Sequence, residues 1–257
     1  MSTQREKAQE LRRLHAAPEP LVLVNAWDAA SARVVAGTPG CRAIATASWS
    51  IAAAHGFPDG ESIPLEVMLA AVKVVADAVE LPVTADLERG YGDAGETVRR
   101  ALEAGAVGCN LEDAGAEGGL VPVEQHVAAV AAARAAGEQA GVPLVINART
   151  DVFLSGLNDM DQAVERARAY LAAGADCAFV PGVRDVATLE ELVIRVRGPV
   201  SVIGGAGGPT LGELAKLGIA RVSYGPGPLG VAMAALRSAA ETLLTGGEPP
   251  AELAFRW

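Results

Sequence analysis

Short runs of β-forming apolar residues alternate with longer segments through most of the chain. In the longer segments, apolar residues recur at intervals of three and four positions, the spacing of one face of a helix. The runs that predict strands cover residues 21–25, 41–46, 82–86, 107–112, 143–148, 177–181, 199–203 and 221–224. The segments that predict helices include 3–15, 63–79, 94–103, 123–139, 160–173, 189–197 and 229–244. Strands that alternate with helices in this order form a parallel sheet.

The alternation is regular along the whole chain, so we expect a single domain over residues 1–257 with no interdomain linker. This length matches one α/β barrel of eight strand–helix units, a (β/α)8 TIM barrel, which we favour over an open doubly wound sheet. The first helix would cover the N-terminal mouth of the barrel. A short C-terminal tail is expected from about residue 246, where glycine and proline break the pattern.

Composition and charge narrow the range of partners. A formal net charge of -10 argues against nucleic acid and anionic membranes. No apolar stretch approaches the roughly 20 residues of a membrane span, and the polar N-terminus lacks the apolar segment of a signal peptide, so we expect a cytoplasmic protein. The three cysteines lie in or beside apolar runs and are expected to be buried thiols. All three lysines fall in predicted helices, which leaves no Schiff-base lysine at a strand end.

Acidic residues gather at the ends of two neighbouring predicted strands. Asp86 and Glu88 end the third, and Glu112 and Asp113 end the fourth. Side chains on a strand alternate between faces, so Asp86 and Glu88 should point the same way, and only one of Glu112 and Asp113 can join them. Barrel enzymes carry their active sites at these strand ends. The cluster therefore predicts a Mg²⁺ site, with helix capping as the alternative for any single acid.

Other strand ends are also polar. Asp28, after the first strand, is most simply the N-cap of the next helix. Small hydroxyl residues after the second strand, in residues 46–50, suggest a loop of exposed amides that could bind a substrate carboxylate. After the fifth strand, Asn147 and Arg149 share a face. Arg149 could meet an anionic substrate, or could form a structural ion pair with Asp151 or Glu112.

Five motifs in this order resemble the isocitrate lyase and phosphoenolpyruvate mutase superfamily. They are Asn25-Ala-Trp-Asp-Ala-Ala-Ser-Ala-Arg33, Gly56-Phe-Pro-Asp-Gly60, Ala85-Asp-Leu-Glu-Arg-Gly-Tyr-Gly92, Asn110-Leu-Glu-Asp113 and Asn147-Ala-Arg-Thr-Asp151. The match extends over about residues 21–224, nearly the whole expected barrel. Each motif alone is weak, but five at the right strand ends make the resemblance specific.

The resemblance implies a Mg²⁺ ion, with Mn²⁺ as the alternative, that binds a pyruvate-like 2-oxo acid. Its ligands, largely through waters, would be Asp59, Asp86, Glu88 and Glu112. Arg149 would neutralise the developing enolate oxygen. The substrate would lie against Trp27, Thr46, Ala47, Ser48, Trp49 and Asn147, with backbone amides of residues 47–49 holding its carboxylate. The resemblance also implies a homotetramer or homodimer in which the helix at 229–244 is exchanged between subunits.

The chain departs from the family pattern at two places. The usual Asp-x-Asp pair is Asp86-x-Glu88 here, and the longer side chain should still reach a metal-bound water. The loop after the fourth strand is only Asp113-Ala-Gly-Ala-Glu-Gly-Gly119. It lacks the Lys-Lys-Cys-Gly-His-like segment of the family's carbon–carbon lyases and the Lys-Thr-Asn-Ser-like segment of its phosphonate-forming mutases. Neither activity carries over in full, and Glu117 is the candidate acid or base on this loop.

What remains is the shared half of the mechanism, in which a bond beside the carbonyl-bearing carbon of a 2-oxo acid breaks or forms through an enolate. We therefore predict a Mg²⁺-dependent lyase that acts on a carbon–carbon bond. One alternative is phosphorus–carbon chemistry, as in phosphonopyruvate hydrolysis or phosphoenolpyruvate mutation. The other is a non-catalytic protein that binds a 2-oxo acid.

Overall fold

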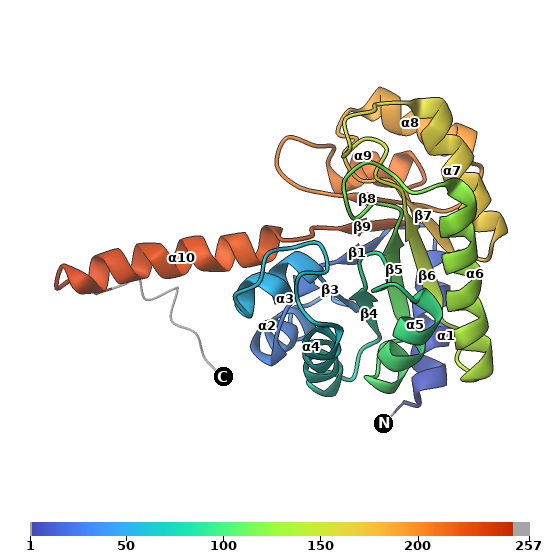
Figure 1. The fold of residues 1–257 in the computed structure, drawn as a ribbon. Helices are drawn as coiled ribbons and strands as arrows, with labels where there is room; N and C mark the ends of the chain where they lie inside the picture. The colour runs from blue at the N-terminus through green and yellow to red at the C-terminus, as the bar shows by residue number, and fades with distance from the viewer. Residues whose placement is uncertain (1, 249–257) are drawn as a thin grey trace.

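The computed structural model describes residues 2–248 and forms a nearly closed barrel of parallel strands surrounded by helices (Figure 1). The strands of this part of the chain are β1 (Leu21–Leu23), β2 (Asn25–Ala26), β3 (Ile44–Thr46), β4 (Val83–Asp86), β5 (Gly108–Glu112), β6 (Val145–Arg149), β7 (Cys177–Phe179), β8 (Val200–Ile203) and β9 (Arg221–Ser223). They form one sheet in the order β1-β9-β8-β7-β6-β5-β4-β3-β2. The expected α/β barrel is confirmed. Most of the expected tail lies outside the described residues.

The first expected strand is divided, which is the main difference from the predicted strand pattern. Val24 separates β1 from β2. β1 pairs with β9, and β2 pairs with β3, so the two halves join the barrel to opposite neighbours. The other seven strands are present, with bounds that differ from the predicted ones by up to three residues.

The helices cover the outside of the sheet and include one that the sequence did not indicate. They are α1 (Gln4–His15), α2 (Ala29–Ala36), α3 (Ser48–Ala54), α4 (Leu65–Asp77), α5 (Ala94–Glu103), α6 (Val123–Gln139), α7 (Met160–Ala172), α8 (Val186–Val196), α9 (Leu211–Lys216) and α10 (Gly227–Leu244). Asp28 caps α2 as predicted, because its side chain accepts a hydrogen bond from the Ser31 amide at 2.7 Å. The unexpected helix is α3, which replaces the predicted loop of exposed amides. No helix among residues 2–248 is both long and apolar enough to cross a membrane.

Helix α1 closes the amino-terminal side of the barrel, as predicted. Leu11 and Leu14 are buried against the strands. The Gln4 amide donates hydrogen bonds to the carbonyl oxygens of Leu102 and Ala106, just before β5. With this side covered, a substrate can approach from the carboxyl ends of the strands.

Helix α10 does not pack along the barrel but extends away from it (Figure 1). Of its residues, only Leu229 is buried in the described chain. An apolar groove with a volume of about 1330 Å³ lies beside the start of α10, between that helix and α2. Its lining includes Val34, Tyr224, Val231 and Leu236.

Candidate active site at the carboxyl ends of the strands

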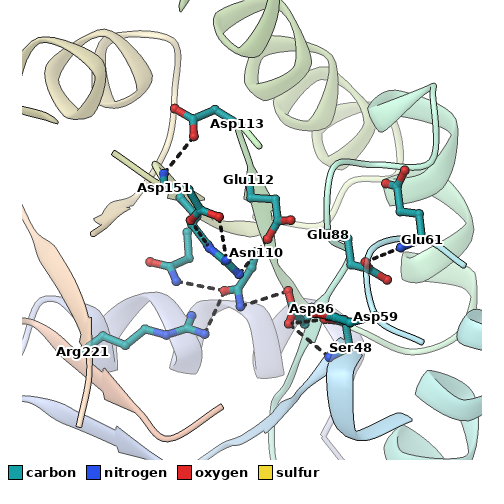
Figure 2. A network of polar contacts seen from close by, with 12 residues as sticks. Ser48, Asp59, Glu61, Asp86, Glu88, Asn110, Glu112, Asp113, Asp151 and Arg221 are labelled. Carbon is teal, nitrogen blue, oxygen red and sulfur yellow. Dashed lines mark hydrogen bonds and ion pairs between the residues drawn. The ribbon is translucent and has the colours of Figure 1, made fainter. Parts of the chain in front are cut away.

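Asp86, the last residue of β4, is held by side chains from the neighbouring strand and helix (Figure 2). Its Oδ2 accepts hydrogen bonds from the amide and hydroxyl of Ser48, at 3.1 and 3.0 Å. Its own amide donates to Thr46 Oγ1 at 2.9 Å. The first turn of α3 thus provides donors for the carboxylate, in keeping with the positive end of a helix. The Ser48 amide, predicted to bind the substrate carboxylate, already binds Asp86.

Asp59 joins this carboxylate from the loop after α3. Ser48 Oγ lies 3.4 Å from Asp59 Oδ1, so one hydroxyl lies between two acids. Surrounding protein and the nearby charge of Asp86 together raise the pKa of Asp59. The charge of Asp86 therefore disfavours the charged form of Asp59, which is the condition that a cation relieves.

Glu88 does not continue the geometry of β4. Its φ of 50° puts it in the left-handed region, and the residue is buried. One carboxylate oxygen accepts from the Glu61 amide at 2.5 Å, and the other from the Tyr91 hydroxyl at 3.0 Å. Burial raises the pKa of Glu88 to about 7, and the charges of Asp86 and Asp59 add to this rise. Glu88 is thus close to the other acids, yet both its oxygens are used to hold residues 61 and 91.

Arg149, at the end of β6, contacts both of the partners considered from the sequence. Its Nη1 lies 2.7 Å from Glu112 Oε2. Its Nε and Nη2 donate to the two oxygens of Asp151, at 2.5 and 2.8 Å. A guanidinium has five N–H donors, so these three contacts leave two for another anion. Burial raises the pKa of Glu112 to about 8 although Arg149 opposes the shift.

Asp113 points away from the mouth, as the alternation with Glu112 predicted. It is fully buried and accepts hydrogen bonds from Arg166 Nη1 at 3.0 Å and from the Tyr170 hydroxyl at 2.6 Å. Its other oxygen accepts from the Asp151 amide at 2.9 Å. Asp113 therefore fixes the backbone of the residue that holds Arg149.

Two asparagines stand in register with Asp86 on the neighbouring strands β5 and β6. Asn147 is fully buried, and its amide donates to Asn110 Oδ1 at 2.9 Å. The Asn110 amide lies 3.5 Å from Asp86 Oδ1. Arg221, from β9, donates to the same Asn110 oxygen at 3.0 Å (Figure 2). Asn147, predicted to contact substrate, is therefore bound to Asn110 in a second layer.

The other residues predicted for the site lie in different parts of the structure. Ala47 is buried as the N-cap of α3, and Trp49 is 45% exposed. Trp27 lines the apolar groove beside α10. Glu117 is exposed on a small hairpin closed by the bridge between Ala114 and Leu120, and within residues 2–248 it forms no side-chain hydrogen bond or ion pair. A cavity of about 430 Å³ beside this hairpin is lined by residues that include Glu112, Glu61 and Arg89.

The acids of the mouth suit a hydrated divalent cation better than a directly bound one. Among the residues described, no three His, Cys, Asp or Glu side chains form a group that could bind a metal ion directly. Mg²⁺ usually retains several waters and needs only one or two carboxylates. Asp86 and Asp59, which share Ser48 and face a single guanidinium, fit a hydrated Mg²⁺ with Glu112 nearby. A site built on direct contact with all four predicted acids does not fit.

Sequence reasoning did not select Asn110, Arg221, Glu61 or Tyr91 as site residues. Asn110 could have been found, because it lies two positions before Glu112 and so shares its face of β5. Arg221 gave no such signal, because its partner Asn110 lies 111 positions earlier in the chain. Glu61 and Tyr91 belong to turns whose backbone conformation the alternating pattern does not describe.

Comparison with known proteins identifies the family. The model of the phosphoenolpyruvate phosphomutase family matches residues 11–244. The chloroplastic carboxyvinyl-carboxyphosphonate phosphorylmutase of Arabidopsis thaliana is 33% identical, over 88% of this chain and 70% of that protein. An oxaloacetate decarboxylase of Rhodopseudomonas palustris is 32% identical, over 76% of this chain and 70% of the relative.

A solved structure extends this likeness to the fold. It is that of a Burkholderia cenocepacia protein provisionally called a phosphonomutase. That protein is 45% identical, with a TM-score of 0.87, over 95% of this chain and all of the other. The family match covers nearly the whole barrel and includes every strand end described above. The chain therefore belongs to the phosphoenolpyruvate phosphomutase family, within the isocitrate lyase and phosphoenolpyruvate mutase superfamily.

Proposed function

We propose that this protein is a Mg²⁺-dependent lyase that makes or breaks a carbon–carbon bond beside a 2-oxo acid through a pyruvate-like enolate. The observation that carries the proposal is the arrangement of Arg149. The guanidinium lies in the acidic mouth and is held by Glu112 and Asp151, and these contacts leave two of its N–H groups for another anion. Its charge opposes the rise in the pKa of Asp59, so the guanidinium and Asp59 are close enough to act on one bound substrate.

Each side chain has a separate task in this mechanism. Asp86 and Asp59 would hold the hydrated Mg²⁺, with Glu112 as a further partner for its waters. When bound, the ion would polarise the 2-oxo group and lower the energy of negative charge on its oxygen. Arg149 would direct its free N–H groups at that oxygen, where the charge increases as the bond breaks. Donors fixed in advance, as Arg149 is by its two carboxylates, stabilise such charge without reorganising.

Within this class, the site best suits decarboxylation of a 2-oxo acid that carries a carboxylate on C3. The bond from C3 to that carboxyl carbon breaks, its electron pair forms the enolate, and CO₂ leaves. A proton then adds to C3 to give the 2-oxo acid product. This route needs no base to begin, which accords with a short loop that brings no side chain other than Glu117. Glu117 remains the candidate donor of the final proton, with water as its competitor.

Phosphorus–carbon chemistry is the second candidate, because the family model and the Arabidopsis relative carry the names of mutases that act on phosphorus compounds. A migrating phosphoryl group concentrates charge that cations must stabilise. In the described chain, Lys7, Lys73 and Lys216 lie on the outer helices α1, α4 and α9. Arg89, which lines the same cavity as Glu112, is already paired with Glu61, so Arg149 and the metal ion would have to stabilise this charge. For this reason we rank the mutase reaction second.

Oxalate binding provides the first test, because oxalate imitates the planar enolate of pyruvate and can chelate a metal. We expect calorimetry to detect oxalate binding with Mg²⁺ and far weaker binding in excess chelator. Equal binding in both conditions would contradict the metal assignment. Incubation with oxaloacetate and with phosphonopyruvate then separates the reactions, since CO₂ release supports the lyase, whereas formation of phosphate or of phosphoenolpyruvate supports the alternative. Binding of both acids without any product would indicate a non-catalytic binding protein.

A further inference from the structure

Arg221 is a charged side chain buried in the barrel interior, outside the mouth where the other site residues lie. It is 1% exposed and is among the largest fully buried side chains of the described residues. Its Nη2 donates to Asn110 Oδ1 at 3.0 Å. Its Nε and Nη1 are also buried and donate to no described residue.

This arginine lacks the acidic partner that normally accompanies a buried charge. In residues 2–248 it forms no ion pair with any carboxylate, whereas Arg149 forms two. On α1, burial lowers the pKa of His15 to about 4 and the charge of Arg221 adds to this shift, so His15 is neutral near pH 7 and offers no counter-charge. A buried charge with so few partners is costly to the folded state. Packing alone would favour an apolar side chain at position 221.

The contact of Arg221 determines how the Asn110 side chain is oriented. Asn110 Oδ1 accepts two hydrogen bonds, one from Arg221 and one from Asn147. With the oxygen directed toward these two donors, the NH₂ group must face the opposite way, toward Asp86 Oδ1. A flipped amide would place NH₂ against two donors and an oxygen against a carboxylate. Arg221 therefore determines which group Asn110 presents to Asp86 (Figure 2).

We infer that Arg221 is a positioning residue that sets the Mg²⁺ affinity of Asp86 from inside the barrel, through Asn110. The inference rests on the proposed function, because it takes Asp86 as the principal metal ligand. Ser48 binds Oδ2 of Asp86, and the Asn110 amide approaches Oδ1. Groups that orient a ligand in this way commonly alter metal affinity by roughly 10–100-fold. The buried charge of Arg221 destabilises the folded state, but it orients the Asp86 carboxylate for the metal ion.

The test is Arg221→Met, which removes the charge and keeps a similar volume. We expect Mg²⁺ affinity, measured by calorimetry, to fall about tenfold, the lower part of that range, because Asn147 still binds Asn110. The melting temperature in excess chelator should stay the same or rise, because a buried charge is replaced by an apolar group. A purely structural arginine gives the opposite pair of results, a lower melting temperature with unchanged Mg²⁺ affinity, and that pair would overturn the inference.

Arg134→Met is the matched control. Arg134 is also a largely buried arginine, but it pairs with Asp176 and donates to the Leu144 carbonyl. Its replacement should lower the melting temperature and leave Mg²⁺ affinity unchanged. Arg221→Lys retains a donor for Asn110 and should restore most of the affinity lost in Arg221→Met. Failure of the lysine variant to improve on methionine would count against the inference.

A double-mutant cycle tests the route through Asn110. In an Asn110→Leu background, Arg221→Met should cause no further loss of Mg²⁺ affinity, because the connecting amide is gone. A full tenfold loss in that background would show that Arg221 acts by another route.

A metal-free measurement separates this inference from the proposed function. Hydrogen exchange at the Ser48 amide, which donates to Asp86, should be faster in Arg221→Met than in the wild type. If the wild type binds no Mg²⁺, the proposed function fails, while the exchange rate still decides whether Arg221 orients Asp86.

Discussion

The mouth of the barrel and the surface around α10 are built in opposite ways. At the mouth, acidic and basic side chains are partly or wholly buried and bonded to one another, as Arg149 is to Glu112 and Asp151. Around α10, apolar side chains face outward, with Val231 72% exposed and Leu236 61% exposed. Polar groups are thus enclosed in one region, and apolar groups are exposed in the other.

This difference shows which of the two regions one copy of the chain forms fully without a partner. Every group at the mouth that the mechanism uses comes from one barrel, and all of them except Glu117 are held by their neighbours. The α10 surface, in contrast, leaves apolar side chains uncovered. Exposed apolar patches of this kind on soluble proteins mark interaction sites. The exposed face of α10 and the groove beside it are both apolar and belong to the same chain. We therefore propose a second copy as the partner, with α10 of each subunit in the groove of the other.

The largest effect should come from removing Asp86. Asp86→Ala is expected to abolish Mg²⁺ binding in calorimetric titration, because the best-held carboxylate of the mouth is lost and Asp59 is left without the acid that shares Ser48 with it. Asp77→Ala is the matched control, since Asp77 is an exposed acid on α4 paired with Lys73. Unchanged Mg²⁺ affinity in folded Asp86→Ala would remove Asp86 from the metal site.

Arg149→Lys should lower kcat by roughly 10²–10³-fold, the effect of losing an oxyanion donor. Lysine can meet one carboxylate as a point charge, whereas the guanidinium meets Glu112, Asp151 and the enolate oxygen together. The fold and much of the Mg²⁺ binding should remain. The melting temperature and kcat should be measured on one preparation. A lower melting temperature with normal turnover per folded molecule would make Arg149 a structural residue only.

On the other side of the comparison, Leu236→Asp should dissociate the oligomer. A charge at the centre of an apolar contact would be buried without a partner, which is strongly unfavourable. Light scattering at micromolar concentration should give a tetramer or dimer for the wild type and a monomer for the variant. Ser238→Asp places the same charge on another exposed position of α10 and should leave the assembly intact. A monomeric wild type would refute the proposal of a second copy.

The smallest expected effect is the pH dependence that the acids of the mouth contribute. Burial raises the folded-state pKa of Glu88 to about 7 and of Glu112 to about 8, above the ordinary value of 4.5. Each of these acids then binds more protons in the folded state than in the unfolded state between those values, which lowers stability as pH rises. Buried His15 and His126, whose pKa values burial lowers to about 4, oppose this below about 6.5, so stability without metal should fall as pH rises from about 6.5 to 8. Saturating Mg²⁺ should reduce this fall.

Thermal denaturation with and without Mg²⁺ across this range measures the effect. For a chain of this size, 1 kcal/mol corresponds to about 2–4 °C in melting temperature. We expect the stabilisation by Mg²⁺ to grow by several degrees between pH 5 and pH 8. Glu112→Gln should flatten the curve in chelator, because it removes one of the two titrating groups. Leu236→Asp should leave the difference between the Mg²⁺ and chelator curves unchanged, since the groove does not titrate in this range.

The sequence by itself determined the features that depend on local periodicity. The alternation of strands and helices predicted the barrel, and the alternation of side chains along β5 placed Glu112 and Asp113 on opposite faces. The position of Asp28 after a strand predicted its role as an N-cap. Each of these follows from one residue and its neighbours within a few positions, where the periods of strand and helix are fixed by backbone geometry.

Only the tertiary structure decided the contacts between distant segments. The division of the first strand at Val24 depends on β3 and β9, which occupy different edges beside it. The left-handed backbone of Glu88 depends on a loop 27 residues away, because the Glu61 amide in that loop donates a hydrogen bond to the Glu88 carboxylate. Arg221 reaches Asn110 across the barrel. The register of distant strands and the burial of side chains between them follow from closure of the whole barrel. No local sequence pattern can therefore specify which buried polar groups will meet.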